Sequence, residues 1–305
     1  MLQRDAFIQE ITKRLEKDKK IYFLSADFGA AALDTLREKF PNNFLHCGIS
    51  EQAMLDVAAG LALEGNKVFV YAMAPFISLR SIEQTKCGAG LMNLPICILS
   101  VGIGLGYADA GPTHYSTEDF ACIRSIVGSS IYTPSDVNLT KMIAHEMLES
   151  PKFSYIRLDR EVLPDLAPQI SGNEYKEGYK IFGEINEKKI VLISHGKMIH
   201  KCLEIQKTNP NKLSCIDLFR SKPFPNSLPK KLSSCQGIVV VDEQTPSGNL
   251  SSCVFEGLSE QNIFPKIITK CLPEMYFYEN GGREFLLNKF GLSSNDILEA
   301  TKKIA

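Results

Sequence analysis

The sequence lacks the features of several common protein classes. No apolar run approaches the roughly 18 residues that a membrane-spanning helix needs, and residues 1–20 are charged throughout, without the apolar segment of a signal peptide. Lysine and arginine (34 together) nearly balance aspartate and glutamate (35), so no net basic field favours nucleic acid or an anionic membrane. We therefore expect a cytoplasmic protein with no nucleic-acid partner and no membrane partner.

Cysteine pairs at metal-binding spacing are also missing. The chain has nine cysteines, but no two of them form a C-x-x-C pair. In a chain of 305 residues this pattern fits neither a disulfide scaffold nor a zinc site. We expect the cysteines to be reduced, and mostly buried as small apolar residues.

Length and periodicity indicate two α/β domains. A chain of 305 residues fits two domains of roughly 100 to 200 residues each. In both halves strands alternate with helices of about 10 to 15 residues, which predicts two doubly wound, mostly parallel sheets with helices on both faces. Between the halves the periodicity fails, and Pro164 and Pro168 add turn chemistry. We therefore place a first domain at 1–165, a linker at 166–180 and a second domain at 181–305.

Hydrophobic spacing predicts the individual elements. An amphipathic helix through Ile8, Ile11 and Leu15 begins the first domain. The other elements expected there are strands at 21–25, 43–46, 67–72, 95–101, 130–132 and 154–158, and helices beginning at 51 and spanning 78–89 and 135–148. Ser116 can cap a further short helix, with Asp119 three residues later, as in a capping box. The second domain is expected to contain strands at 190–194, 212–216, 237–242 and 264–268, and helices at 198–206, 248–258 and 295–303.

The stretch that organises the chain is 47–60, C-G-I-S-E-Q-A-M-L-D-V-A-A-G. A short strand-like run stops at Gly48, Ser50 can cap the turn that follows, and apolar residues then recur at helical spacing. Glu51 therefore opens a helix. An acidic residue at that position can serve only to complement the helix dipole. Other motifs of the chain point to a further role.

Three blocks resemble the transketolase family of thiamine diphosphate enzymes. G-I-S-E-Q at 48–52 is similar to the stretch that carries the glutamate bound to the aminopyrimidine of the cofactor. Ala-Pro-Phe at 74–76, leading into Arg80, is similar to the pyrimidine-stacking segment, and Gly-Pro-Thr-His at 111–114 to the G-P-T-H turn. The blocks stand in the order of the family. The resemblance covers nearly all 305 residues, as the C-terminal two-thirds of a full-length transketolase.

This resemblance implies a catalytic role for Glu51. Thiamine diphosphate reacts at its C2 carbon, which loses its proton to the amino group of the cofactor once the ring nitrogen across the pyrimidine is protonated. A carboxyl group that is hydrogen-bonded to this nitrogen promotes that step. Glu51 is therefore the candidate catalytic and cofactor-binding residue, and the remaining chemistry belongs to the cofactor.

Phe76, Met73 and Asp27 are further candidates for cofactor contacts. The resemblance implies that Phe76 stacks on the pyrimidine, although an aromatic residue at the head of a helix is more often part of a core. Met73 and Leu79 stand where the family usually has other aromatic residues, so the expected pocket is more aliphatic. Asp27 ends a predicted strand, where ligands collect in open parallel sheets. The resemblance places Asp27 near the thiazolium ring, and a plain cap or turn residue is the alternative.

The substrate end is expected around His114. A glycine-rich loop at 102–111 allows close approach of the backbone to a ligand, and it leads directly to this histidine. The resemblance implies that His114 points at the reacting carbon and binds or transfers protons of the sugar hydroxyls. The other four histidines lack such a context, and we expect them to be structural or to lie on the surface.

The substrate residues of the family are only partly present. An aspartate commonly stands directly before G-P-T-H, where this chain has Ala110, with Asp109 one residue earlier. A histidine that helps to grip the sugar phosphate is replaced near Ser100. Arg160, in L-D-R, matches the phosphate-binding arginine, although an arginine after a strand can form only a surface ion pair. A modified or activated sugar is therefore allowed.

The diphosphate signature of the family, G-D-G followed by an asparagine, occurs nowhere in the chain. A hard metal bound to a diphosphate needs oxygen ligands placed by such a loop. The resemblance therefore implies that a separate N-terminal transketolase subunit carries the G-D-G site and is the main binding partner of the metal ion, Mg²⁺ or Ca²⁺. The active centre is then expected to lie between subunits. We expect an α2β2 heterotetramer or a homodimer of this chain.

The favoured function is that of the C-terminal subunit of a split transketolase. Such an enzyme moves a two-carbon ketol unit from a ketose to an aldose in carbohydrate metabolism. The β subunit of a 2-oxo acid dehydrogenase is an alternative of similar size, but Pro-Thr at 112–113 and the Ala-Pro-Phe segment favour transketolase. Deoxyxylulose phosphate synthase fits G-P-T-H but is normally one long chain.

A non-catalytic transketolase-like binding protein is the remaining alternative. Ala110 and the missing G-D-G favour it. The retention of Glu51, Phe76 and His114 together argues against it.

Overall fold

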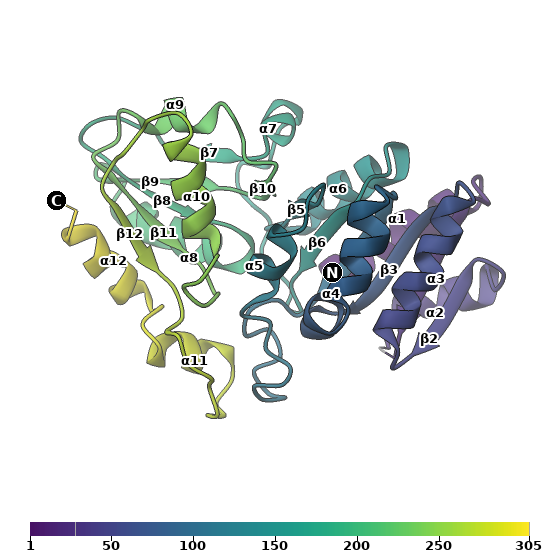
Figure 1. Ribbon diagram of the computed structural model, residues 1–305. Coiled ribbons are helices and arrows are strands. Elements are labelled where there is room, and N and C mark those ends of the chain that lie inside the picture. Colours follow the sequence, from purple (N-terminus) through teal and green to yellow (C-terminus); the bar gives the residue numbers. More distant parts are fainter. Residues whose placement is uncertain (28, 305) are drawn as a thin grey trace.

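The computed structural model describes residues 1–27 and 29–304, and it confirms two mostly parallel α/β units (Figure 1). The first sheet has seven strands in the order β10-β5-β6-β4-β3-β1-β2, and only β10 is antiparallel to its neighbour. The elements of the first unit are α1 (Gln3–Leu15), β1 (Ile21–Ala26), α2 (Ala31–Lys39), β2 (Phe44–Gly48), α3 (Glu51–Leu63), β3 (Lys67–Met73), η1 (Phe76–Arg80), α4 (Ile82–Gln84), η2 (Thr85–Leu91), β4 (Ile96–Val101), α5 (Asp119–Arg124), β5 (Ser130–Tyr132), α6 (Val137–Glu149) and β6 (Ser154–Leu158).

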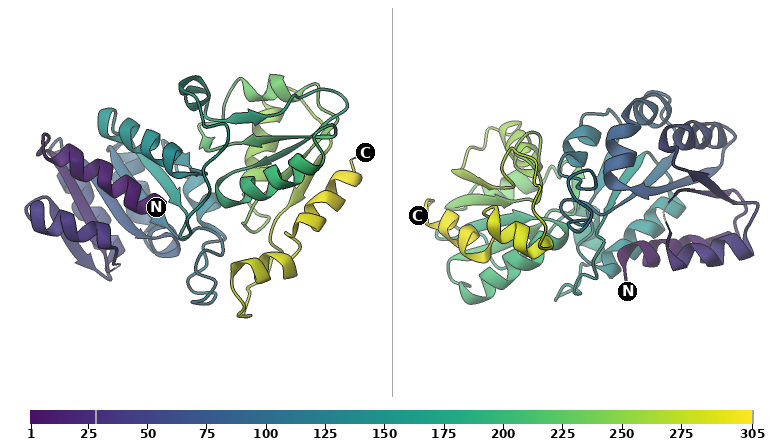
Figure 2. Two further views of the ribbon diagram at one scale, coloured as in Figure 1. Left: turned by 180° about the vertical axis from the view of Figure 1, so that it is seen from behind. Right: turned by 90° about the horizontal axis from the view of Figure 1, so that it is seen from below.

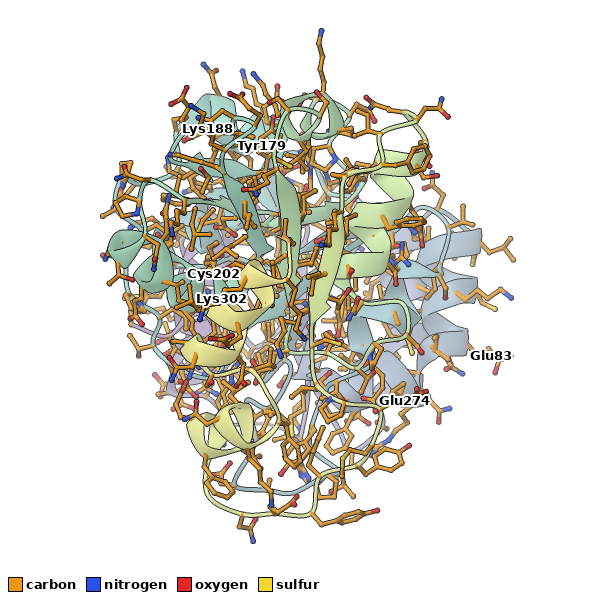
Figure 3. The ribbon with its side chains drawn as sticks, turned by 90° about the vertical axis from the view of Figure 1, so that its left-hand side faces the viewer. Glu83, Tyr179, Lys188, Cys202, Glu274 and Lys302 are labelled. Atoms are coloured by element: carbon orange, nitrogen blue, oxygen red, sulfur yellow. The ribbon has the colours of Figure 1, made fainter. Side chains whose placement is uncertain are left out.

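The second sheet has five strands in the order β12-β11-β8-β9-β7, and β7 is antiparallel to β9. Figure 3 views the molecule from this side, with α12, which carries Lys302, in front. The elements after β6 are α7 (Gly172–Glu177), β7 (Lys180–Phe182), β8 (Ile190–Ser194), α8 (Gly196–Thr208), β9 (Leu213–Asp217), β10 (Arg220–Lys222), α9 (Leu228–Leu232), β11 (Gly237–Val241), α10 (Leu250–Ser259), β12 (Ile267–Lys270), α11 (Arg283–Lys289) and α12 (Ser294–Lys302).

Each sheet is covered on both faces, as parallel sheets require. In the first unit α1, α2 and α6 pack on one face, and α3, α5 and the helical segment 76–91 pack on the other. In the second unit α8, α11 and α12 cover one face, and α9 and α10 cover the other. The apolar cluster beneath α3 and α5 continues into the one beneath α9 and α10. One hydrophobic core therefore joins the two units, which lie side by side in both views of Figure 2.

The prediction of a regular helix at 78–89 is wrong. The chain is already helical at Phe76, and the segment consists of two π-helical stretches around a short α-turn. The hydroxyls of Ser78, Ser81 and Thr85 each donate to the carbonyl oxygen four residues earlier, at 2.6, 2.8 and 3.0 Å. Such side-chain bonds compete with the regular helical ladder.

Two expected helix caps are also wrong. The hydroxyl of Ser50 donates back to the carbonyl of Cys47 instead of accepting from the first turn of α3. Ser116 does not cap α5, because that helix begins only at Asp119, and the Asp119 carboxylate pairs with Arg157. Neither hydroxyl therefore caps the helix that follows it.

Most other expected elements are confirmed to within one to three residues, and several short ones were missed. The missed elements are α2, α7, α9, α11, β7 and β10. The short strand β10 leaves the second unit and pairs with β5 of the first sheet, so the chain passes between the units three times. The division into a first domain at 1–165, a linker at 166–180 and a second domain at 181–305 stays a prediction. Within the described residues, no helix is both long enough and apolar enough to cross a membrane.

A buried polar contact links the two units at Ser135. Its hydroxyl donates to Asp217 Oδ1 at 2.8 Å and accepts from the backbone N–H of Gly196 at 2.9 Å. Asp217 is fully buried, and its Oδ2 has no partner among the described residues. Burial raises the pKa of Asp217 well above its ordinary value.

This raised pKa predicts a pH-dependent stability. Above about pH 4 the unfolded chain has released the Asp217 proton while the folded chain retains it, so stability falls as the pH rises, by about 1.4 kcal/mol per pH unit up to the folded pKa. We expect Asp217→Asn to remove this slope, and so to stabilise the protein at pH 8 more than at pH 5. Urea unfolding at both pH values tests this, with the exposed Asp34→Asn as control. An equal effect at both pH values would contradict it.

Candidate active site at the carboxyl edge of the first sheet

The candidate residues gather at one edge of the first sheet. Asp27 follows β1, Glu51 follows β2, Phe76 follows β3, loop 102–116 follows β4 and Arg160 follows β6. These strands are parallel, and in the sheet they lie in the order β6-β4-β3-β1-β2. Their carboxyl ends therefore meet at the same edge, which is where open parallel sheets bind ligands.

Glu51 is a buried carboxylate with one partner. It is the first residue of α3 and only 3% exposed. Its Oε2 accepts a hydrogen bond from Arg80 Nη1 at 2.7 Å. None of the described residues donates to Oε1, so this oxygen can accept a proton donor from a ligand.

Arg80 connects Glu51 with Phe76. Its guanidinium carbon lies 4.5 Å from the centroid of the Phe76 ring, while Nη1 bonds to Glu51. A planar group with a hydrogen-bond donor therefore fits against this ring and this carboxylate together. An aminopyrimidine needs the same two contacts, so the residues present fit the pyrimidine end of the expected cofactor. Arg80 had no role in the sequence interpretation, because spacing alone does not show which carboxylate an arginine reaches.

His114 also contacts Phe76. The two ring centroids are 5.3 Å apart and the rings meet edge to face at 73°. The turn that carries the histidine closes through a hydrogen bond from its N–H to the Gly111 carbonyl at 3.0 Å, with Gly111 in the left-handed region at φ +84°. The Thr113 hydroxyl lies 2.9 Å from Nδ1 and orients the ring. Glu51, Arg80, Phe76 and His114 thus form one continuous series of contacts.

Arg160 and Asp109, which the sequence suggested separately as substrate residues, pair with each other. Arg160 Nη1 bonds to Asp109 Oδ1, and the guanidinium also lies 4.4 Å from the Tyr107 ring centroid. The hydrogen bond from Arg160 lowers the pKa of Asp109. The side chains are 38% and 65% exposed, so the pair is weak and an anionic ligand can replace Asp109.

Two other candidates lie at the same edge without joining these contacts. Asp27 is 59% exposed, and its Oδ1 is 3.8 Å from Nε2 of His46. Among the described residues it makes no ion pair with any of the other candidates. Met73 is the last residue of β3 and is partly buried. Their roles stay predictions.

A cavity of about 430 Å³ opens beside Phe76 and the G-P-T-H turn. One wall comes from the second unit through Tyr276, which the sequence gave no reason to select because it lies in an irregular segment. Tyr115 also lines the cavity, and burial raises the pKa of its hydroxyl. The lining residues are Pro75, Phe76, Leu79, Arg80, Pro112, Thr113, Tyr115, Glu118 and Tyr276.

The described residues contain no group of three or more His, Cys, Asp or Glu side chains that could hold a metal ion. All nine cysteines are free: four are buried, four are partly buried, and Cys87 is exposed.

Comparison with protein families gives two matches along the chain. Residues 1–165 match the model for the pyrimidine binding domain of transketolase, and residues 184–297 match the model for the transketolase C-terminal domain.

Two relatives match almost end to end. A subunit of the apulose-4-phosphate transketolase of Phocaeicola vulgatus is 27% identical over 313 residues, which cover 98% of this chain and 97% of that protein. The 6-deoxy-6-sulfo-D-fructose transketolase subunit SqwH of a Clostridium species is 25% identical over 307 residues, which cover 99% and 94%.

Solved structures agree with this fold. A split-gene transketolase, described as an inactive beta4 tetramer, superposes with a TM-score of 0.83 at 25% identity over 100% of this chain and 98% of its own. Several longer transketolase chains match over 46% of their length. The expected share of two-thirds of a full-length transketolase is therefore wrong.

The Glu51–Arg80 contact predicts an energetic coupling. Arg80→Met leaves a buried carboxylate without its donor, and we expect the free energy of unfolding at pH 7 to fall by about 1–2 kcal/mol. Once Glu51→Gln has removed the charge, the loss of Arg80 should cost less. A double-mutant cycle by urea unfolding should give a coupling of about 1 kcal/mol, limited by the 40% exposure of Arg80. Strictly additive single effects would show that the contact contributes nothing.

Proposed function

Because this chain belongs to the transketolase family, we propose that it is the C-terminal subunit of a split transketolase. In this proposal the chain supplies the pyrimidine end of a thiamine diphosphate site, and a partner subunit with a G-D-G loop supplies the diphosphate and metal end. The end-to-end match to two proteins named as transketolase subunits supports the split arrangement. An α2β2 assembly, the metal as Mg²⁺ or Ca²⁺, and location in the cytoplasm stay predictions of the sequence.

The contact series at the sheet edge carries the proposal for the chemistry. Thiamine diphosphate, when bound, supplies a nucleophilic carbon for ketol transfer. Glu51 holds the ring nitrogen of the pyrimidine through a carboxyl oxygen in a site that excludes most water, and there it can share a proton. Phe76 fixes the plane of the ring. His114, at the edge of Phe76, binds sugar hydroxyls and moves protons at the substrate end.

The substrate is proposed to be a modified sugar with an anionic group. The two relatives are named for apulose 4-phosphate and for 6-deoxy-6-sulfo-D-fructose, sugars that carry a phosphate and a sulfonate. Arg160 supports this, because its present partner Asp109 is an exposed carboxylate that a second anion can replace. Ala110 removes one hydroxyl-binding group common in the family, which suits a donor with altered hydroxyls.

The alternatives receive less support. Both matching family models are described as transketolase domains. A non-catalytic role would place no requirement on Glu51, yet its carboxylate is buried, with Oε2 bonded to Arg80 and Oε1 left without a donor among the described residues. Catalysis therefore remains the favoured proposal.

The first test of the catalytic role is Glu51→Gln. Loss of the shared proton should lower ketose-dependent turnover of the two-subunit assembly by about 100- to 10,000-fold.

Calorimetric titration of thiamine diphosphate with Mg²⁺ should detect binding to the mixture of subunits and not to this chain alone.

A matched control is Glu10→Gln, which changes a glutamate that is 8% exposed on α1, away from the sheet edge. We expect it to leave turnover unchanged. If the mixture neither forms a complex nor binds the cofactor, the proposed function fails and a binding protein becomes the better assignment.

The substrate proposal predicts a selective effect of Arg160→Met. The KM for a phosphorylated or sulfonated ketose should rise about 10- to 100-fold, because a charge-assisted hydrogen bond is lost, while the KM for an uncharged ketose should change little. Arg37→Met is the control: its side chain is 39% exposed and its partner Asp34 is 62% exposed, much like the Arg160 pair. Equal effects of Arg160→Met on charged and uncharged ketoses would exclude anion binding by this residue.

A further inference from the structure

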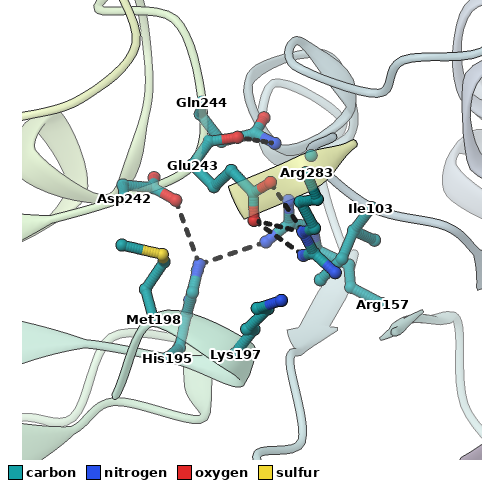
Figure 4. Close-up of a pocket in the computed structure, with 10 residues that line it drawn as sticks. Ile103, Arg157, His195, Lys197, Met198, Asp242, Glu243, Gln244 and Arg283 are labelled. Atoms are coloured by element: carbon teal, nitrogen blue, oxygen red, sulfur yellow. Dashed lines mark hydrogen bonds and ion pairs between the residues drawn. The ribbon is translucent and has the colours of Figure 1, made fainter. Parts of the chain in front are cut away.

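A buried arginine of the second unit reaches the base of the candidate site. Arg283, the first residue of α11, is 6% exposed (Figure 4). Its Nη1 and Nη2 donate to the two oxygens of Asp159, in the first unit, at 2.8 and 2.9 Å. Its Nε and Nη2 donate to the two oxygens of Glu243, in the second unit, at 2.8 and 2.6 Å. One guanidinium therefore binds two carboxylates from different units.

Glu243 in turn holds the beginning of loop 102–116. Its Oε1 accepts a hydrogen bond from the N–H of Leu105 at 2.9 Å. The preceding residue is Gly104, at φ +58°, where a Cβ would lie 2.7 Å from Cδ of Glu243. Only glycine allows the backbone of the loop to approach this carboxylate so closely.

The residues after Glu243 hold the end of the same loop. Gln244 Nε2 donates to the Ser116 carbonyl at 2.7 Å, and the N–H of Thr245 donates to the Thr117 carbonyl at 3.1 Å. Gly104 and Ser116 exchange two backbone hydrogen bonds, at 2.9 and 2.8 Å, which close the loop at its base. Three successive residues of the second unit thus fix both stems of the loop that carries His114.

Asp159, at the other end of the guanidinium, directly precedes Arg160. Its Oδ1 accepts from the N–H of Glu161 at 2.8 Å, and its own N–H donates to Gln3 Oε1 at 2.8 Å. The backbone on both sides of Arg160 is therefore held. Since the side chain of Arg160 pairs with Asp109 of the loop, the arginine and the loop depend on the same support.

Arg283 keeps its positive charge in this buried position. Burial alone would lower its pKa, but the neighbouring carboxylates of Asp159 and Glu243 raise it well above the ordinary value. Buried ion pairs of this kind seldom stabilise a protein more than apolar residues of the same volume would. A shared apolar core already joins the two units. The specific contribution of the cluster is therefore its geometry.

We propose that Arg283 is a positioning residue: through Glu243 and Asp159 it fixes loop 102–116 and Arg160 relative to each other, and so sets the separation of the two groups that hold the sugar. The second unit then contributes to substrate binding through these hydrogen bonds to the first unit. This inference rests on the proposed function, because it assumes that His114 and Arg160 bind the sugar.

The test uses Arg283→Lys and Glu243→Gln in the assembly with the partner subunit. Lysine keeps the charge, but a single ammonium cannot bind both carboxylates in the geometry of the guanidinium. We expect kcat/KM for the ketose donor to fall about 100-fold, largely through KM, because the substrate groups lose their relative placement. The affinity for thiamine diphosphate should stay within about twofold, because Glu51 and Phe76 do not contact the cluster. Glu243→Gln, which keeps an acceptor for Leu105, should have a smaller effect in the same direction.

Arg124→Met provides the matched control. Arg124 on α5 also binds a carboxylate across the two units, with bonds of 2.6 and 3.0 Å to Glu256 on α10, but it touches neither loop 102–116 nor Arg160. It should lower the melting temperature and leave kcat/KM unchanged. All kinetic measurements are made at a temperature where each variant is folded.

Hydrogen exchange supplies a readout that does not depend on activity. In Arg283→Lys the amides of residues 105–116 should exchange about tenfold faster than in the wild type, and in Arg124→Met they should not. If Arg283→Lys keeps wild-type kcat/KM and exchange, or loses cofactor affinity and activity in parallel, Arg283 is only a structural residue. If the wild-type assembly transfers no ketol unit, the proposed function fails, and exchange alone decides whether Arg283 orders the loop.

Discussion

The parallel pairing of the first sheet is the constraint on which the candidate site depends. Because β6, β4, β3, β1 and β2 run in one direction, the segments that follow them meet at one edge, although they are spread from Asp27 to Arg160 along the chain. Glu51 and Phe76 leave strands that are not adjacent in the sheet, and Arg80 closes the distance between them. The order of strands thus decides which residues can share a ligand.

The two units are coupled in two physically different ways. A continuous apolar cluster between α3, α5, α9 and α10 supplies adhesion without direction. Buried hydrogen bonds fix the relative orientation of the two units. At one point Ser135 bonds to Asp217. At another, Glu243 and Gln244 bond to loop 102–116, and Arg283 bonds to Asp159. The second unit, which supplies none of the residues proposed here for the pyrimidine ring, can therefore still determine how precisely the proposed substrate end is built.

Local chemistry explains where regular structure is interrupted near the site. Hydroxyl groups in the segment after β3 compete for helix carbonyls, and the chain winds there as π-helix, with Arg80 in contact with both Glu51 and Phe76. Glycines at 104 and 111 adopt left-handed conformations that other residues rarely tolerate, and they allow the loop to pass close to Glu243 and then to turn at His114. These interruptions occur where the site needs a particular direction of the chain.

Sequence alone determined the fold class, and it indicated the residues that we propose for the pyrimidine end. Hydrophobic alternation reports which segments are strands and helices, and the three motif blocks follow strands that must end together. Short elements such as β7, β10 and α11 escaped, because three to seven residues carry too little periodicity. The hydroxyl of Ser50 does not cap α3 because it donates to the carbonyl of Cys47. Ser116 does not cap α5 because that helix begins only at Asp119.

Only the tertiary structure decided which charged groups pair. The sequence shows Arg80, Arg160 and Arg283 as three arginines with no visible partner, whereas the fold brings them to Glu51, Asp109 and the pair Asp159 and Glu243. The Arg283 contacts join residues 124 positions apart across the two units and residues 40 positions apart within the second unit. Charge pairing of this kind depends on distances of a few ångströms between segments remote in sequence, and no local pattern encodes it.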